Sequence, residues 1–211
     1  FTITDLKGNL SNTAAGPNSV TLADNDDGDY TITSSTAITV NNGTAQVGDD
    51  VTLAGAGNKT VTALAADLTL ADSNTGTTEV TSMAGNALSI TADAAAGNLT
   101  VDAADLAEDT DLTLVGGANG KTATVNNLVG DVVASTLDSV LTVNLADADN
   151  NDISITTGTF TTSVLGSAAD DTVSVIATAM ADDVLLTTAG AGEFTITDLK
   201  GNLSNTAAGP N

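Results

Sequence analysis

The chain has 211 residues and a formal net charge of −23, because 27 acidic residues face only four lysines and there is no arginine. This charge repels nucleic acid and anionic membranes, and no run of about 18 apolar residues predicts a membrane span. The absence of cysteine excludes disulfides, and without histidine and arginine as well the usual catalytic triads and bases are missing, so we expect no enzyme.

Strands are predicted from one end of the chain to the other by a recurring triad, apolar–Thr/Ser–apolar, which alternates with period two. The triads begin at Val20, Tyr30, Ile38, Val51, Leu68, Leu88, Leu99, Leu112, Leu141, Ile153, Val173 and Phe194. Clusters of Gly, Asn, Asp and Ala separate them and indicate turns. No segment keeps an apolar stripe at helical spacing for more than about two turns, so the sequence predicts an all-β fold.

Two architectures fit these strands. A parallel β-solenoid with coils of about 20 residues would hold a narrow aliphatic interior, and like residues would stack on like in neighbouring coils. Tandem antiparallel β-sandwich domains are the alternative. Aromatic residues make up only 2% of the chain, and no linker is evident between possible domains, which favours the solenoid with nine or ten coils.

Residues 1–18 reappear letter for letter as residues 194–211, so Phe194 is the equivalent of Phe1. We expect residues 1–193 to be one full repeat unit, made of three diverged sub-repeats of about 60–70 residues, and residues 194–211 to begin the next identical unit. The sub-repeats are recognised at Val51, Leu112 and Leu185, where a strand, a Gly-rich turn and a second strand recur. Identical units stacked end to end are the expected partners, and the identical ends predict the same local environment at both ends.

Three turns concentrate carboxylates, and alternating Asp and Asn oxygens can supply ligands to Ca²⁺. The candidate ligands are Asp24, Asp26, Asp27, Asp29, Asp147, Asp149, Asn151, Asp152, Asp170 and Asp171, with a weaker cluster at Asp49 and Asp50. Ca²⁺ is the only cofactor that the sequence suggests. The competing interpretation is that these turns are solvated and oppose lateral aggregation.

The segment Gly166-Ser-Ala-Ala-Asp-Asp-Thr-Val-Ser-Val175 resembles the glycine/aspartate turns of RTX-type calcium-binding repeats. The wider texture, such as Leu-Thr-Leu-x-Gly-x-Gly, is similar to the giant beta-strand-repeat exoproteins of bacteria. The resemblance implies a secreted protein at the bacterial cell surface. Two functions are then expected: a structural segment of an extracellular filament or coat, or a calcium-stiffened stalk of a giant adhesin.

Overall fold

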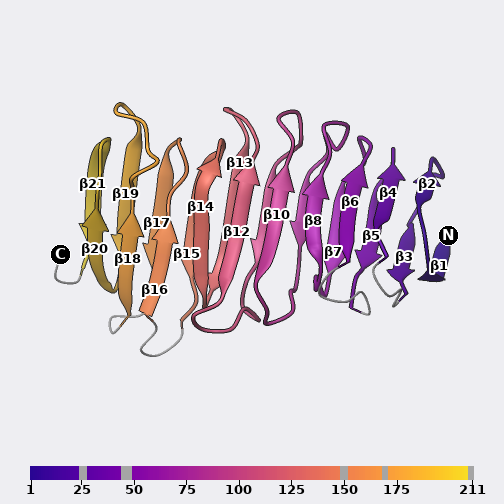
Figure 1. The fold of residues 1–211 in the computed structure, drawn as a ribbon, viewed down its shortest axis with the longest axis horizontal. Helices are drawn as coiled ribbons and strands as arrows, with labels where there is room; N and C mark the ends of the chain where they lie inside the picture. Colours follow the sequence, from indigo (N-terminus) through magenta and orange to yellow (C-terminus); the bar gives the residue numbers. More distant parts are fainter. Residues whose placement is uncertain (24–27, 44–48, 148–151, 168–170, 209–211) are drawn as a thin grey trace.

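The structure is a computed structural model that describes residues 1–23, 28–43, 49–147, 152–167 and 171–208. Every element in these ranges is a β-strand, and the strands form two parallel sheets wound into a β-solenoid (Figure 1). The predicted solenoid is therefore confirmed, and the alternative of antiparallel sandwich domains is wrong. Within the same ranges, no helix has the length and hydropathy needed to cross a lipid bilayer.

The odd-numbered strands form one sheet, called sheet A here, and the even-numbered strands form the other, sheet B. Sheet A contains β1 (Thr2–Leu6), β3 (Ser19–Leu22), β5 (Ile38–Asn41), β7 (Lys59–Thr62), β9 (Thr78–Val80), β11 (Leu99–Asp102), β13 (Thr122–Leu128), β15 (Val140–Leu145), β17 (Thr162–Gly166), β19 (Leu185–Gly190) and β21 (Asn202–Ala207). Sheet B contains β2 (Leu10–Asn12), β4 (Tyr30–Ser34), β6 (Asp50–Ala54), β8 (Asp67–Leu70), β10 (Leu88–Ala92), β12 (Asp111–Gly116), β14 (Asp131–Leu137), β16 (Asp152–Thr156), β18 (Thr172–Ile176) and β20 (Glu193–Thr197).

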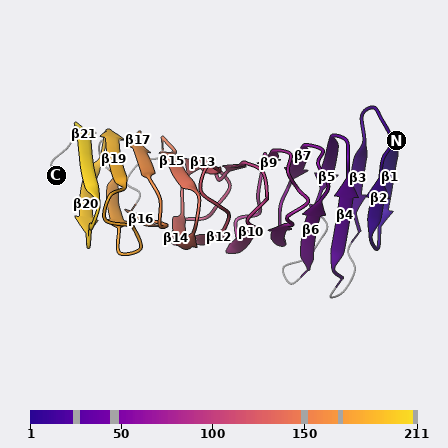
Figure 2. The same cartoon turned by 90° about the horizontal axis from the view of Figure 1, so that it is seen from above.

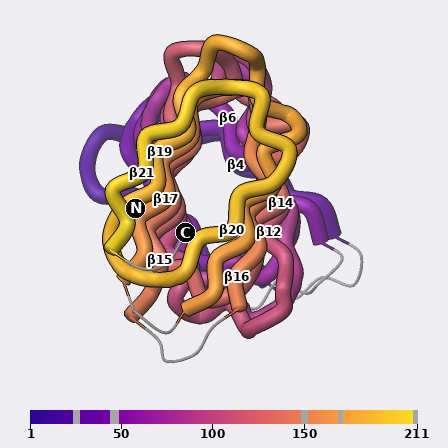
Figure 3. Tube along the Cα trace, turned by 90° about the vertical axis from the view of Figure 1, so that its left-hand side faces the viewer, coloured from indigo at the N-terminus to yellow at the C-terminus, as the bar shows by residue number. Residues whose placement is uncertain are grey.

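Each coil consists of one strand from each sheet, and the two sheets form separate layers along the axis (Figure 2). Tyr30 lies beside Val51 in the next coil, and Val173 lies beside Phe194, so a coil holds about 21 residues at these points. The view along the axis shows successive coils superposed on one another (Figure 3).

The core is a narrow column of aliphatic side chains between the sheets. Strand β15 shows its origin: Leu141, Val143 and Leu145 are buried, while the residues between them are only partly buried. Period-two alternation turns every second side chain inward, and stacked coils bury these side chains against one another. Tyr30 and Phe194 are the exceptions in size. The Tyr30 hydroxyl donates a 2.5 Å hydrogen bond to the Ala23 carbonyl oxygen, which satisfies the polar end of the ring inside the core.

Outward-facing threonines stack on threonines, as the sequence predicts. Thr52 of β6 lies between Thr31 of β4 and Thr69 of β8 in the ladder of sheet B. The β-branched side chain fits the pleat, so identical neighbours repeat the same packing from coil to coil.

The two copies of the repeated segment share one unusual backbone angle, but their corresponding strands lie in opposite sheets. Asp5 and Asp198 are equivalent in the repeat, and both have positive φ, 56° and 55°. Yet β1 belongs to sheet A, whereas β20, which contains the first residues of the second copy, belongs to sheet B. The expected equality of environment therefore holds for this backbone angle and fails for the sheet.

Candidate functional site

Acidic residues form a column along the edge where the strands of sheet B begin, the lower edge in Figure 1. The first residue of these strands is repeatedly a carboxylate: Asp50 in β6, Asp67 in β8, Asp111 in β12, Asp131 in β14, Asp152 in β16 and Glu193 in β20. Asp29 directly precedes β4. This edge of the solenoid thus carries a nearly continuous row of negative charge.

Neighbouring carboxylates in the column lie in register, and some of them bond to the next coil. Asp50 pairs with Asp67, and Asp111 pairs with Asp131 in the strand ladder. Asp67 Oδ1 accepts a 2.8 Å hydrogen bond from the Ser89 backbone N–H. Asp131 Oδ1 accepts one of 2.7 Å from the Ser154 N–H. These bonds to backbone donors tie β8 to β10 and β14 to β16.

The electrostatic strain of the column shows at Asp131. Burial raises the pKa of this carboxyl above its ordinary value, the hydrogen bond from Ser154 opposes the rise, and the nearby charges of Asp111 and Asp109 add to it. Ionisation of Asp131 is therefore less favourable in the folded chain than in the unfolded chain.

Four of the predicted calcium ligands belong to the acidic edge: Asp29, Asp147 and Asp171 precede strands of sheet B, and Asp152 is the first residue of β16. Of the predicted ligands, Asp29, Asp147, Asp152 and Asp171 are within the described residues, whereas Asp24, Asp26, Asp27, Asp149, Asn151 and Asp170 lie outside them. Among the residues that the structure describes, no three acidic side chains gather closely enough to hold a metal ion. Calcium binding at these turns stays a prediction.

On the opposite edge, the Lys59 side chain enters the interior and is only 1% exposed. Its Nζ donates to the carbonyl oxygens of Gly55 at 2.8 Å and Gly57 at 2.5 Å, to that of Ser34 at 3.3 Å, and to Asn74 Oδ1 at 3.2 Å. Burial lowers the pKa of this amine to about 8. Lys59 thus joins acceptors from neighbouring coils, a role that its position in a Gly/Asn-rich turn of the sequence did not indicate.

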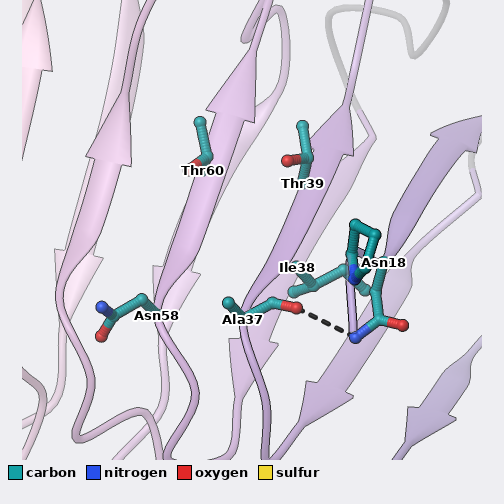
Figure 4. A pocket seen from close by; sticks show the side chains of 7 residues that line it. Asn18, Ala37, Ile38, Thr39, Asn58 and Thr60 are labelled. Carbon is teal, nitrogen blue, oxygen red and sulfur yellow. Dashed lines mark hydrogen bonds between the residues drawn. The ribbon is translucent and has the colours of Figure 1, made fainter. Parts of the chain in front are cut away.

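A polar network continues the same edge toward the first coil. Asn12 Nδ2 donates to Ser34 Oγ at 3.0 Å, and Asn18 Nδ2 donates to Thr36 Oγ1 and to the Ala37 carbonyl oxygen, both at 3.0 Å. The bond from Asn18 to Ala37 is visible in Figure 4. Buried amides and hydroxyls here link coils as the backbone ladders do in the sheets.

The hollow in Figure 4 has a volume of about 160 Å³ and lies next to this network. It is lined by Pro17, Asn18, Ala37, Ile38, Thr39, Asn58 and Thr60. Thr39 and Thr60 come from the neighbouring strands β5 and β7. The lining offers amide and hydroxyl groups but neither a carboxylate nor an amine, so its chemistry is that of weak hydrogen bonding.

Comparison with protein-family models, with curated protein sequences and with solved structures finds no match to this chain.

The acidic column could have been found from the sequence alone. Of the eight triads that lie in sheet B, six directly follow an acidic residue, whereas none of the four triads that lie in sheet A does.

Proposed function

We propose that this chain is a structural segment of an extracellular filament or cell-surface coat built from tandem β-solenoid units. The observation that carries the proposal is the position of the second copy of the repeat. Residues 194–208 continue the solenoid as its next coil, since β20 pairs with β18 and β21 pairs with β19. The start of a unit is therefore also a coil that fits the end of a unit.

The ladders at this junction are as regular as those inside the unit. The pairing of β20 with β18 runs in register from Thr172–Glu193 to Ile176–Thr197, and that of β21 with β19 runs from Leu185–Asn202 to Gly190–Ala207. Parallel strand pairs of this kind transmit load through backbone hydrogen bonds. An array of such units would be a rod with no linker between repeats.

The extracellular location rests on the resemblance to secreted bacterial repeat proteins and on the cysteine-free, acidic composition. The proposal assigns the chain no catalytic role, because the buried polar side chains of Lys59, Asn12 and Asn18 bond to other parts of the solenoid.

A two-unit chain, in which residues 1–193 are placed directly before residues 1–211, tests the proposal. At about 4.8 Å per coil we expect a straight rod of about 95 Å by small-angle scattering, against about 50 Å for the present chain. A matched control carries a flexible Gly/Ser insert directly after the first copy of Glu193. The proposal fails if the two-unit chain without the insert is as bent as the control.

The acidic edge favours a second candidate, a calcium-stiffened stalk of a large adhesin. Carboxylates that repel one another in register would gain from a bound divalent cation. In this case Ca²⁺ raises the melting temperature more than NaCl of equal ionic strength does, and EDTA reverses the rise. An unchanged melting temperature eliminates this candidate.

Electron microscopy of the cell surface separates the two functions. Long uniform fibres indicate the filament or coat, and single projections with distinct tips indicate the adhesin stalk.

A further inference from the structure

The chain contains two Asn-Gly pairs, Asn42-Gly43 and Asn119-Gly120, and each lies in a connection that follows a strand, β5 or β12. An asparagine that precedes glycine can react with the backbone of its neighbour, because glycine has no Cβ to restrict its conformation or shield its nitrogen. The two pairs have the same chemistry but different surroundings, so a difference in their reactivity must come from the fold.

The Asn119-Gly120 pair is exposed and free to move. It lies in the turn between β12 and β13, which the Lys121 N–H closes by donating a 3.1 Å hydrogen bond to the Ala118 carbonyl oxygen. Among the described residues, neither the Asn119 side-chain amide nor the Gly120 N–H has a hydrogen-bond partner. A Cβ on Gly120 would meet nothing within 4 Å, so the space around this residue is open.

The Asn42-Gly43 pair is held by the next coil. The Asn42 side chain is 0% exposed, and the Asn42 N–H donates a 3.0 Å hydrogen bond to the Thr62 carbonyl oxygen. The Gly43 N–H is also engaged, because it donates to Asn41 Oδ1 at 3.0 Å. A Cβ on Gly43 would lie only 3.2 Å from Ala63 Cβ, so the chain has little room to rearrange there.

We propose that Asn119 is a site of spontaneous deamidation and that the fold protects Asn42 from the same reaction. The Gly120 nitrogen attacks Asn119 Cγ, and a bond between these two atoms forms as the bond from Cγ to Nδ2 breaks. Nδ2 leaves as ammonia and takes the proton of the Gly120 N–H, which leaves a cyclic imide. Solvent water then opens the ring at either carbonyl and gives aspartate or isoaspartate, so water is the only co-reactant.

The selectivity follows from the conformation that ring closure needs. The attacking nitrogen must come within about 3–3.5 Å of the side-chain carbonyl carbon in the correct orientation. The exposed turn at Asn119 can reach this geometry without breaking a hydrogen bond of the pair. Asn42 would have to leave its buried position and give up the bonds of its own N–H and of the Gly43 N–H.

The reaction adds charge at a place where the solenoid has no acidic column. The turn follows Gly116, the last residue of β12, and therefore lies at the edge opposite to the acidic one. The ladder pairs that flank it, Gly116 with Leu137 and Thr122 with Val140, do not include the altered residues. The solenoid should therefore stay folded while the turn gains a negative charge. This inference goes beyond the proposed function and does not depend on it, because it concerns one turn within a single unit.

Incubation of the full chain at mildly alkaline pH, followed by peptide mapping with mass spectrometry, tests the proposal. In the folded chain, deamidation at Asn119 should be at least about tenfold faster than at Asn42. In a parallel sample unfolded in urea, the two sites should react at similar rates, because both precede glycine and neither is protected. Circular dichroism checks that the first sample stays folded throughout.

Asn119→Gln is the matched control variant, since it keeps an exposed amide but would have to close a larger and less favourable ring. Ion-exchange chromatography should show the folded parent chain gaining negative charge with time and the variant gaining far less. Three results would overturn the proposal: an intact Asn119 in the folded chain, an Asn42 that reacts as fast as Asn119 there, or an equal preference for Asn119 in urea. The last result would mean that the neighbouring sequence, and not the fold, selects the site.

Discussion

Phe1 and Phe194 are the same residue of the same repeated segment, yet Phe1 is 43% exposed and Phe194 is 3% exposed. Phe194 belongs to β20 and lies beside Val173 of β18, whereas Phe1 directly precedes β1, whose neighbour among the described strands is β3. Burial of this residue is therefore a property of stacking and not of the segment itself.

The shift of sheet between the two copies follows from an odd number of strands. β20 lies nineteen strands after β1, so one unit contains nine and a half coils. Equivalent strands of successive units in a strict array would alternate between the sheets, and the full structural repeat would be two units.

The interior column should account for most of the stability. Leu114 is 1% exposed, whereas Leu165 is 46% exposed on the surface. We expect Leu114→Ala to lower the free energy of unfolding by about 2–5 kcal/mol, because it leaves a cavity in the core. Leu165→Ala serves as the control and should change it by less than about 0.5 kcal/mol. Chemical denaturation measures both, and equal losses would mean that the column is not the core.

A close approach of neighbouring coils explains the glycines of one corner. A Cβ on Gly97 would lie 1.9 Å from the Gly76 carbonyl oxygen, and a Cβ on Gly76 would lie 2.6 Å from that of Gly57. Gly97→Ala should therefore cost about 1–3 kcal/mol in thermal or chemical unfolding. Gly8→Ala is the matched control, since a Cβ there meets nothing within 4 Å. A neutral Gly97→Ala would show that the coils separate easily at this corner.

The solenoid itself was predictable because period-two triads, small aliphatic residues and few aromatics all favour it. The sheet to which each strand belongs was not predictable, because the number of residues in a coil varies with the length of its connections. Asp50 pairs with Asp67, whereas Leu88 pairs with Leu112, so the first of these coils is several residues shorter than the second. Counting residues at an average coil length cannot show whether residue 194 falls in sheet A or sheet B.

The sheet in which each sub-repeat begins was not predictable from the sequence either. Those that begin at Val51 and Leu112 start in sheet B, on β6 and β12, but the one that begins at Leu185 starts in sheet A, on β19.

In the candidate site, the acidic residues before the triads could be identified from the sequence. The burial of Lys59 could not be identified, since it depends on carbonyl groups that only the stacked coils bring together.

Lys59 should make the stability of the folded chain depend on pH in the alkaline range. Its pKa is about 8 in the folded chain and 10.5 ordinarily, so between these values the unfolded chain binds more protons. The contribution of Lys59 to stability should therefore rise with pH from about 8 to 10.5 and be constant below this window. Subtracting the profile of Lys59→Met from that of the unsubstituted chain isolates this contribution from other groups. A difference that falls with pH in this window would contradict the assignment.

The same Lys59→Met variant should be less stable at neutral pH. It leaves the carbonyl oxygens of Gly55 and Gly57 without the amine that they bond, at a cost of about 1–3 kcal/mol. Urea unfolding measures the loss, and a more stable variant would show that burial of the charge outweighs these bonds.

Replacement of Asp131 by asparagine should stabilise the folded chain, whereas Lys59→Met destabilises it. Because its pKa is raised in the folded chain, the ionised carboxylate favours unfolding, and its contribution to stability falls as pH rises through the ordinary value toward the raised one. Asp131→Asn removes the charge and retains an oxygen for the Ser154 N–H, so we expect the melting temperature at pH 7 to rise by about 1–2 °C. Below about pH 4 the advantage should disappear, because the native carboxyl is then also neutral. Asp131→Ala removes the acceptor as well and should lower the melting temperature at both pH values. If Asp131→Asn behaves as Asp131→Ala does, the charge of this carboxylate stabilises the column instead of straining it.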